Sequence, residues 1–187
     1  IGLYEHQSAG ALQGLLNLIQ EDPSIALDPT LLLSMKITAY EPAFGIIGDP
    51  AKRNPKTRQS ADHSMIYIVS TMLRKAQEIA SSDGAAFFAQ PNDEMWKRLM
   101  LTPYDFDNGA INNLATRSIM DTVSFEHGGT DYDEKYPDGI PTSIAITTRD
   151  GSVLESGLIM YPSGHARNTS CNLEDILRAK FIMLGQI

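Results

Sequence analysis

The sequence has 187 residues, of which 42% are hydrophobic and 20% are charged, and its formal net charge is -8. This length and composition are typical of one globular domain, or one large piece of one, with a sizeable core. The negative charge argues against a nucleic-acid-binding protein, which usually carries a basic face, and against binding to anionic membranes. No run of about 18 apolar residues is present, so the sequence predicts no membrane-spanning segment.

Metal and thiol chemistry have little support in the sequence. The single cysteine, Cys171, excludes an intrachain disulfide and a cysteine-rich zinc or iron–sulfur site. No base adjoins it in the sequence, so we interpret Cys171 as a spectator. The acidic segment 131–135 fails as a calcium loop, because Lys135 stands where an oxygen ligand is needed and Tyr136 where glycine is needed. The sequence therefore predicts no metal site.

The first predicted element is a helix over residues 1–20 that begins near Glu5 or His6. Its leucines and isoleucines recur at helical spacing, and a proline shortly afterwards ends it. Gly10 and Gly14 lie four residues apart, so this helix allows another backbone to approach closely, at a cost in helix propensity of about 1 kcal/mol each.

A strand and a basic loop are expected next. Strand-forming residues over 35–40 and 44–47 flank Glu41-Pro42 and predict one strand with a bend or bulge. The loop that follows is the most basic part of this acidic chain. Its cations either lie on a solvated loop or hold carboxylate or phosphate groups, which suit the planar arginine fork. They are Lys52, Arg53, Lys56 and Arg58.

The stretch Asn54–Ala80 predicts a long central helix, because its apolar residues recur at helical spacing along one face. A separate row of polar side chains follows the same helix at intervals of three or four residues. This row is typical of a solvated helix face, and it also suits a site for an acidic ligand. Its members are His63, Tyr67, Ser70 and Arg74.

The remaining elements complete an α+β pattern. We expect a loop over 81–91, a helix over 94–101 and a second helix from Asn112 or Asn113 to Asp121, with Leu114, Ala115 and Ile119 inward. A strand over 122–126 follows, and then a hairpin of strands 142–149 and 152–161 around Asp150-Gly151. The last predicted element is an amphipathic helix over 173–184. Leu173, Ile176, Leu177, Phe181 and Leu184 of that helix have the spacing of core residues. The order of elements predicts an antiparallel or mixed sheet with helices packed on one face.

Three separated segments, in this order along the chain, resemble the MmgE/PrpD family and in particular its fungal 2-methylcitrate dehydratases. They are NPKTRQSADHSMIYIV, FEHGGTDYDEKYPDGIPTSIAI and YPSGHARNT. The resemblance covers essentially the whole chain and implies that residues 1–187 form the single α+β lid domain of that family. It also implies an all-helical domain upstream of Ile1, to which the helix at 171–187 would lead back.

The activity that this resemblance implies is the elimination of water from 2-methylcitrate to give 2-methyl-cis-aconitate in propionate catabolism. Such a hydro-lyase, or dehydratase, works without a cofactor. It needs groups that hold the carboxylates, a base that removes a proton next to a carboxylate, an acid that protonates the departing hydroxide, and donors that stabilise the enolate-like charge. The domain alone is expected to be inactive.

The resemblance also assigns residues. His6 and Tyr67 match positions where the family places a histidine and a tyrosine against the substrate. His63, beside Asp62, is either a third catalytic group or a residue that caps or braces the helix. Gln7, Lys52, Arg53 and Arg58 are candidates for substrate binding, and Gly164, His165 and Arg167 match a motif that we interpret as structural, with Arg167 bridging to the helical domain.

Two other functions remain open at the level of sequence. One is cis-aconitate decarboxylase, a member of the same family that acts on a related tricarboxylate. The other is a non-catalytic module for dimerisation or for binding small acids. For the dehydratase, the resemblance implies a homodimer in mitochondria whose partners are a tricarboxylate substrate and the helical domain of the same chain, with neither nucleic acid nor membrane.

Overall fold

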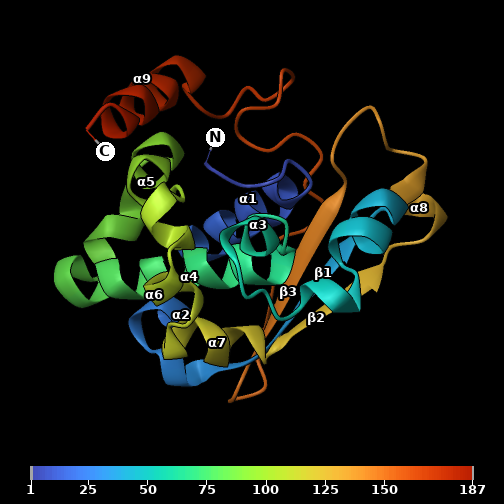
Figure 1. The fold of residues 1–187 in the computed structure, drawn as a ribbon, viewed down its shortest axis with the longest axis horizontal. Coiled ribbons are helices and arrows are strands. Elements are labelled where there is room, and N and C mark those ends of the chain that lie inside the picture. Colours follow the sequence, from blue (N-terminus) through green and yellow to red (C-terminus); the bar gives the residue numbers. More distant parts are fainter. Residues whose placement is uncertain (1, 187) are drawn as a thin grey trace.

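The computed structural model describes residues 2–186, which form one four-stranded mixed sheet with helices packed against it (Figure 1). The strands are β1 (Leu32–Ala39), β2 (Val123–His127), β3 (Thr142–Thr148) and β4 (Val153–Glu155), in the order β2-β1-β3-β4. β1 is parallel to β2 and antiparallel to β3, and β3 is antiparallel to β4. The predicted fold class is therefore confirmed.

The helices are α1 (Ser8–Glu21), α2 (Ser24–Leu27), α3 (Arg58–Ala61), α4 (Met65–Asp83), α5 (Asn92–Leu99), α6 (Asn108–Ile111), α7 (Leu114–Met120), α8 (Thr130–Asp133) and α9 (Leu173–Leu184). Figure 1 shows α1, α2, α4 and α7 on one side of the strands. Met35 and Ile37 of β1 point into the core beside Ile146 and Ile144 of β3, with which they are in register. The two central strands thus supply alternate apolar side chains to one buried face.

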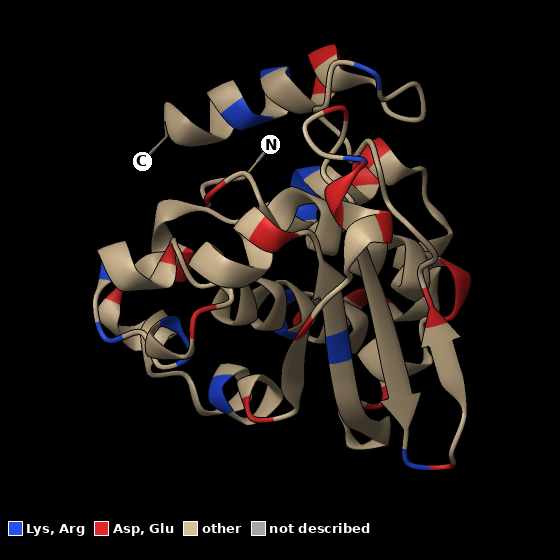
Figure 2. Ribbon diagram, turned by 90° about the vertical axis from the view of Figure 1, so that its right-hand side faces the viewer, with Lys and Arg blue, Asp and Glu red and all other residues tan. Residues whose placement is uncertain are grey.

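Charged residues are distributed over the helices, the loops and the solvent-facing side of the sheet. On that side Lys36 of β1 pairs with Glu126 of β2 at 3.0 Å. Figure 2 shows lysines and arginines interspersed with aspartates and glutamates over many elements. The net charge of -8 is thus a property of the whole chain and not of one acidic lobe.

The predicted hairpin is confirmed, although its second strand is shorter than expected. Gly151 takes a φ of +91°, a left-handed conformation that favours glycine and closes the turn between β3 and β4. β4 ends at Glu155, and Gly157 at φ +63° turns the chain away from β3. Ile159 then rejoins the sheet through a bridge to Thr142.

The prediction of a strand over 44–47 is wrong, because Ala43–Ile47 form a π-helical turn. Pro42 enters this turn with helical backbone angles, φ -59° and ψ -35°. Phe44 then packs against the side chains of β2, with its ring centroid 5.9 Å from Phe125 and 5.7 Å from His127. Packing against β2 thus replaces strand pairing in this segment.

The stretch expected as one long helix consists of two helices with a turn between them. Thr57 caps α3 in a capping box with Ser60. The Ser64 hydroxyl accepts a hydrogen bond from the Tyr67 amide at 3.3 Å and caps α4. His63 therefore lies in the turn, and the helix cap, one of the alternatives for His63, is provided by Ser64.

The other predicted helices are present, but two of their expected inward faces are wrong. α9 has the expected bounds, yet only Ile176 among its residues is buried, and Leu177, Phe181 and Ile182 are 47%, 81% and 54% exposed. α9 lies against α5, where Lys97 and Asp175 pair at 2.6 Å, and this contact covers one narrow stripe (Figure 1). In α7, Ile119 is buried as expected, whereas Leu114 and Ala115 are exposed.

The close approach predicted at the first helix is present, and it leads to a stability prediction. A Cβ at Gly10 would lie 2.9 Å from the Ile140 carbonyl oxygen, which belongs to the backbone and cannot turn away. We expect Gly10→Ala to destabilise the protein by about 1–2 kcal/mol, since overpacking exceeds the gain in helix propensity. Urea unfolding measures this change.

Gly14→Ala is the matched control on the same helix. Its Cβ would lie 3.1 Å from the Ser156 hydroxyl oxygen and 3.2 Å from the Ser156 Cβ, so it would be less crowded than a Cβ at Gly10. We expect Gly14→Ala to cost less stability than Gly10→Ala, because the gain in helix propensity of about 1 kcal/mol offsets the milder contact. Equal effects of the two substitutions would contradict the packing that we assign to Gly10.

Candidate functional site

A hollow of about 270 Å³ lies where the N-terminal segment crosses the turn between α3 and α4. Two backbone hydrogen bonds hold that segment, from the Leu3 amide to the Leu101 carbonyl at 3.2 Å and from the Glu5 amide to the Asp62 carbonyl at 3.1 Å. Segments far apart in the sequence thus form one wall. The lining residues are Leu3, Tyr4, Glu5, Arg58, Asp62, His63 and Phe106.

An aspartate and a histidine form a hydrogen-bonded pair at this hollow. The His63 Nδ1 lies 2.5 Å from an Asp62 carboxylate oxygen, and the His63 side chain is 59% exposed. A carboxylate on one ring nitrogen orients the imidazole and leaves the other nitrogen for proton transfer. The His63 Nε2 makes no hydrogen bond with another described residue, so it is the free ring nitrogen at this hollow.

Glu5 is a second proton-handling group in the hollow, and the sequence analysis did not select it. Its carboxylate accepts hydrogen bonds from the Ser8 amide at 3.2 Å and from the Ser8 hydroxyl at the start of α1. Burial nevertheless raises the pKa of Glu5, and the hydrogen bonds from Ser8 offset only part of this rise. A half-buried carboxyl group with a raised pKa at a hollow is a candidate general acid.

Two tyrosines near the start of the chain and the end of β1 are poorly hydrated. Burial raises the pKa of Tyr4 and of Tyr40 well above the usual tyrosine range, and the charge of Glu5 makes a smaller contribution to both shifts. Tyr40 is fully buried, and its ring stacks on that of Tyr136 at 4.6 Å. Tyr4 lines the hollow together with Glu5.

The expected histidine at the start of the domain lies next to this hollow without lining it. His6 is exposed in the turn that leads into α1, directly after Glu5. Because the Glu5 amide bonds to the Asp62 carbonyl, the peptide segments that carry His6 and His63 run side by side. Gln7 is half-buried at the position that precedes α1.

The expectation that Tyr67 contacts the ligand does not agree with the structure. Tyr67 is fully buried, and its hydroxyl donates a hydrogen bond to the Asp105 carbonyl at 2.5 Å. Its ring lies 6.0 Å from that of Phe106, which lines the hollow. Tyr67 is therefore one layer beneath the surface of the hollow, because its place on α4 faces the core.

The rest of the expected polar row on α4 is neither a solvated face nor part of this hollow. Ser70 is fully buried, and Arg74 turns inward toward Asp105, 3.5 Å away. Lys75 donates to the same carboxylate at 2.8 Å, as does the Thr102 amide at 2.8 Å. Arg74 thus belongs to an internal charged cluster centred on Asp105, whereas Ser70 is buried outside it.

The structure separates the three cations expected to bind substrate into different surroundings. Arg58 lines the hollow beside His63. Lys52 and Arg53 lie at a 3₁₀ turn, half-buried and exposed respectively, and neither lines the hollow. Arg167 forms an ion pair with Asp138 within the domain, and its side chain remains 58% exposed.

The comparisons and searches for other site types add no candidate. Among residues 2–186, no three His, Cys, Asp or Glu side chains gather as a metal ion would require. No helix in that part of the chain is long and apolar enough to cross a bilayer. No protein-family model and no curated protein matches the sequence. The hollow around His63 is therefore the candidate site.

The raised pKa of Glu5 predicts a specific pH dependence of stability. A carboxyl group whose pKa is higher in the folded state stabilises the fold below its ordinary value of 4.5, and this contribution is lost as pH rises through the folded-state pKa. Glu5→Gln stays neutral, so we expect its free energy of unfolding to gain on that of the parent as pH rises above 4.5. Urea unfolding from about pH 4 to 7 measures the difference.

Glu21→Gln is the control, since it removes an exposed carboxylate from the other end of the same helix. We expect its difference from the parent to stay constant over that pH range. A constant difference for Glu5→Gln as well would show that burial does not perturb the Glu5 carboxyl group.

Proposed function

We propose that this chain forms one side of the active site of a hydro-lyase of the MmgE/PrpD type, and that the reaction is the cofactor-independent dehydration of 2-methylcitrate. The observation that carries the proposal is the hollow in which Arg58, His63 and Glu5 converge. These three side chains supply a carboxylate-binding fork, an oriented imidazole and a carboxyl group with a raised pKa.

Each group has a role in eliminating water from a polycarboxylate. Arg58 binds a substrate carboxylate through its planar guanidinium group. His63, oriented by Asp62, removes the proton next to a carboxylate through its Nε2. Glu5, which retains its proton to a higher pH than an ordinary glutamate, protonates the departing hydroxide. His6, on the adjoining segment, anchors the substrate from the rim.

One guanidinium group does not balance the charge of a tricarboxylate, especially beside the carboxylate of Asp62. The proposal therefore includes a second set of cationic groups from a helical domain of the same protein. In this arrangement the 187-residue chain binds part of the substrate but does not turn it over. The same family resemblance leads us to propose a homodimer located in mitochondria.

The test compares the 187-residue chain with a longer protein that contains it. Each is supplied with 2-methylcitrate while the ultraviolet absorbance of the unsaturated product is followed, and separately with cis-aconitate while itaconate is measured. We expect turnover of 2-methylcitrate by the longer protein alone. Appreciable turnover by the 187-residue chain would refute the divided site, and itaconate as the main product would replace dehydration with decarboxylation.

A further inference from the structure

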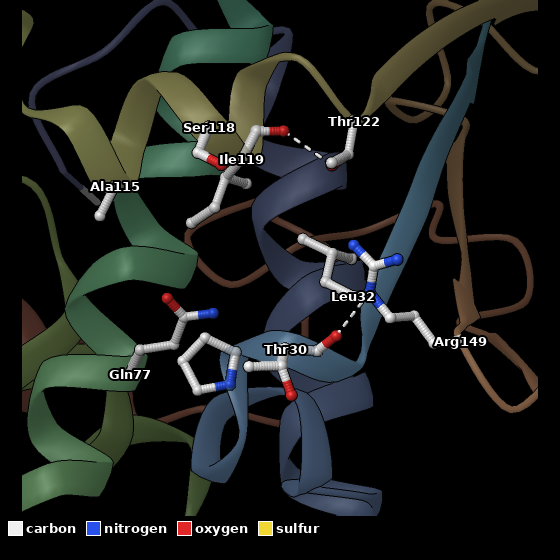
Figure 3. A pocket seen from close by; sticks show the side chains of 9 residues that line it. Thr30, Leu32, Gln77, Ala115, Ser118, Ile119, Thr122 and Arg149 are labelled. Carbon is white, nitrogen blue, oxygen red and sulfur yellow. Dashed lines mark hydrogen bonds between the residues drawn. The ribbon is translucent and has the colours of Figure 1, made fainter.

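A second hollow, of about 350 Å³, lies between α4, α7 and the end of β3 (Figure 3). It shares no lining residue with the hollow around His63. Apolar side chains, including Leu32 and Ile119, cover part of its wall, and Gln77, Ser118 and Arg149 contribute polar groups. Its volume is at the small end of the range of ligand pockets, so it suits a small molecule.

Arg149 is fixed at one side of this hollow. Its Nε donates to the Thr30 carbonyl at 2.8 Å, and its backbone amide donates to the Leu31 carbonyl at 2.8 Å. Among residues 2–186, no carboxylate lies within ion-pair distance of its guanidinium group. Figure 3 shows this group beside Leu32, turned toward the hollow. A positioned guanidinium group without a carboxylate partner has room for an external anion.

Three acidic residues adjoin the lining residues in the chain, Asp28, Asp121 and Asp150. The Asp28 carboxylate accepts hydrogen bonds from the Thr30 amide at 3.0 Å and from the Thr30 hydroxyl at 2.6 Å. The Asp150 carboxylate accepts hydrogen bonds from the Thr148 hydroxyl at 2.5 Å and from the Ser152 amide at 3.0 Å. None of the residues that line the hollow is acidic.

The opposite wall provides an acceptor. Gln77 is 9% exposed, and its Nε2 donates to the Ile25 carbonyl at 3.2 Å. This bond fixes the amide group, while its carbonyl oxygen makes no hydrogen bond with another described residue. Figure 3 shows Gln77 reaching into the hollow from α4, across from Arg149. A ligand that fits has an anion at one end and a hydrogen-bond donor at the other.

We propose that this second hollow binds a small monocarboxylate that carries a hydroxyl group on a short apolar stem. The carboxylate binds the Arg149 guanidinium group, the stem lies over Leu32 and Ile119, and the hydroxyl donates to the Gln77 carbonyl oxygen. This binding site is independent of the proposed dehydratase reaction, since it uses none of the residues of the first hollow.

The probe is 3-hydroxybutyrate, added to the ¹⁵N-labelled 187-residue chain while amide chemical shifts are recorded by NMR. We expect saturable shifts at Gln77, Ser118 and Arg149 with a dissociation constant of about 1–10 mM. The neutral 3-hydroxybutyramide lacks the charge, and inorganic phosphate lacks the apolar stem. Both should bind at least about tenfold more weakly. Equal shifts from all three compounds, or no saturation at the lining residues, would overturn the proposal.

Two variants locate the site. Arg149→Gln removes the charge, and Ala115→Trp places a large side chain in the hollow from an exposed position while leaving Arg149 and its bond to Thr30 intact. Each should weaken binding at least about tenfold. Arg178→Gln, which removes an exposed arginine of α9, should leave binding unchanged.

Thermal unfolding shows whether each variant is folded. If Arg149→Gln does not fold, Ala115→Trp decides, because its wild-type position is exposed. Unchanged binding in the folded Ala115→Trp variant would overturn the proposal.

Discussion

Replacing Asp105 with alanine is expected to lower the free energy of unfolding by about 3–5 kcal/mol, because it leaves buried positive charge without a partner. The Asp105 carboxylate is 9% exposed and lies 2.8 Å from the Lys75 ammonium group and 3.5 Å from Arg74. It also accepts a hydrogen bond from the Thr102 amide at 2.8 Å. Urea unfolding at neutral pH measures the loss.

Asp107→Ala is the matched control, two positions further along the chain. The Asp107 side chain caps α6 by accepting a hydrogen bond from the Ala110 amide at 2.7 Å and pairs with no buried cation. Loss of such a cap costs about 1 kcal/mol. Asp105→Asn should fall between the two, since it keeps an acceptor but loses the charge. A cost for Asp105→Ala no greater than for Asp107→Ala would show that the cluster adds no stability beyond a turn.

The second large effect is on turnover of 2-methylcitrate by the longer protein in which we propose the complete site. We expect His63→Gln to reduce kcat by about 10²–10⁴-fold, the usual contribution of a positioned acid or base. His127→Gln is the matched control, because the His127 imidazole also pairs with an aspartate, Asp133 at 3.0 Å, but away from the hollow. Its kcat should stay within about threefold of the parent value. Equal losses in the two variants would remove His63 from the proposed site.

Tyr67→Phe distinguishes the buried structural role that Tyr67 has in the fold from the substrate contact expected from the sequence. A phenol that touches substrate would lose kcat on this change, whereas the buried Tyr67 loses a hydrogen bond to the Asp105 carbonyl. We expect the free energy of unfolding to fall by about 1–3 kcal/mol, with kcat within about tenfold of the parent value. A 10²-fold or larger loss of kcat in the folded variant would show that Tyr67 contacts the substrate.

Features that depend on neighbouring residues could be predicted from the sequence, and those that depend on distant contacts could not. The Asp150-Gly151 turn and the bounds of α9 follow from local patterns and are confirmed. The exposure of Phe181 could not be predicted from local patterns, because helical spacing shows which residues share a face and not what lies opposite that face.

The candidate site shows the same division. Arg58 and His63 stand out in the sequence, whereas Glu5 becomes a candidate only when its segment pairs with Asp62. The Asp105 cluster has a local signal in the sequence. Thr102 and Asp105 have the spacing of a capping box, and such a box indicates an ordered turn.

The parallel pairing of β1 with β2 has a consequence for how this chain folds. The two strands are neighbours in the sheet, yet everything from residue 40 to residue 122, including both α3 and α4, lies between them in the chain. Closing so long an excursion costs chain entropy before the strand pairing compensates for it. Folding should therefore be limited by the docking of β2 against β1, and formation of the complete sheet should be a late step.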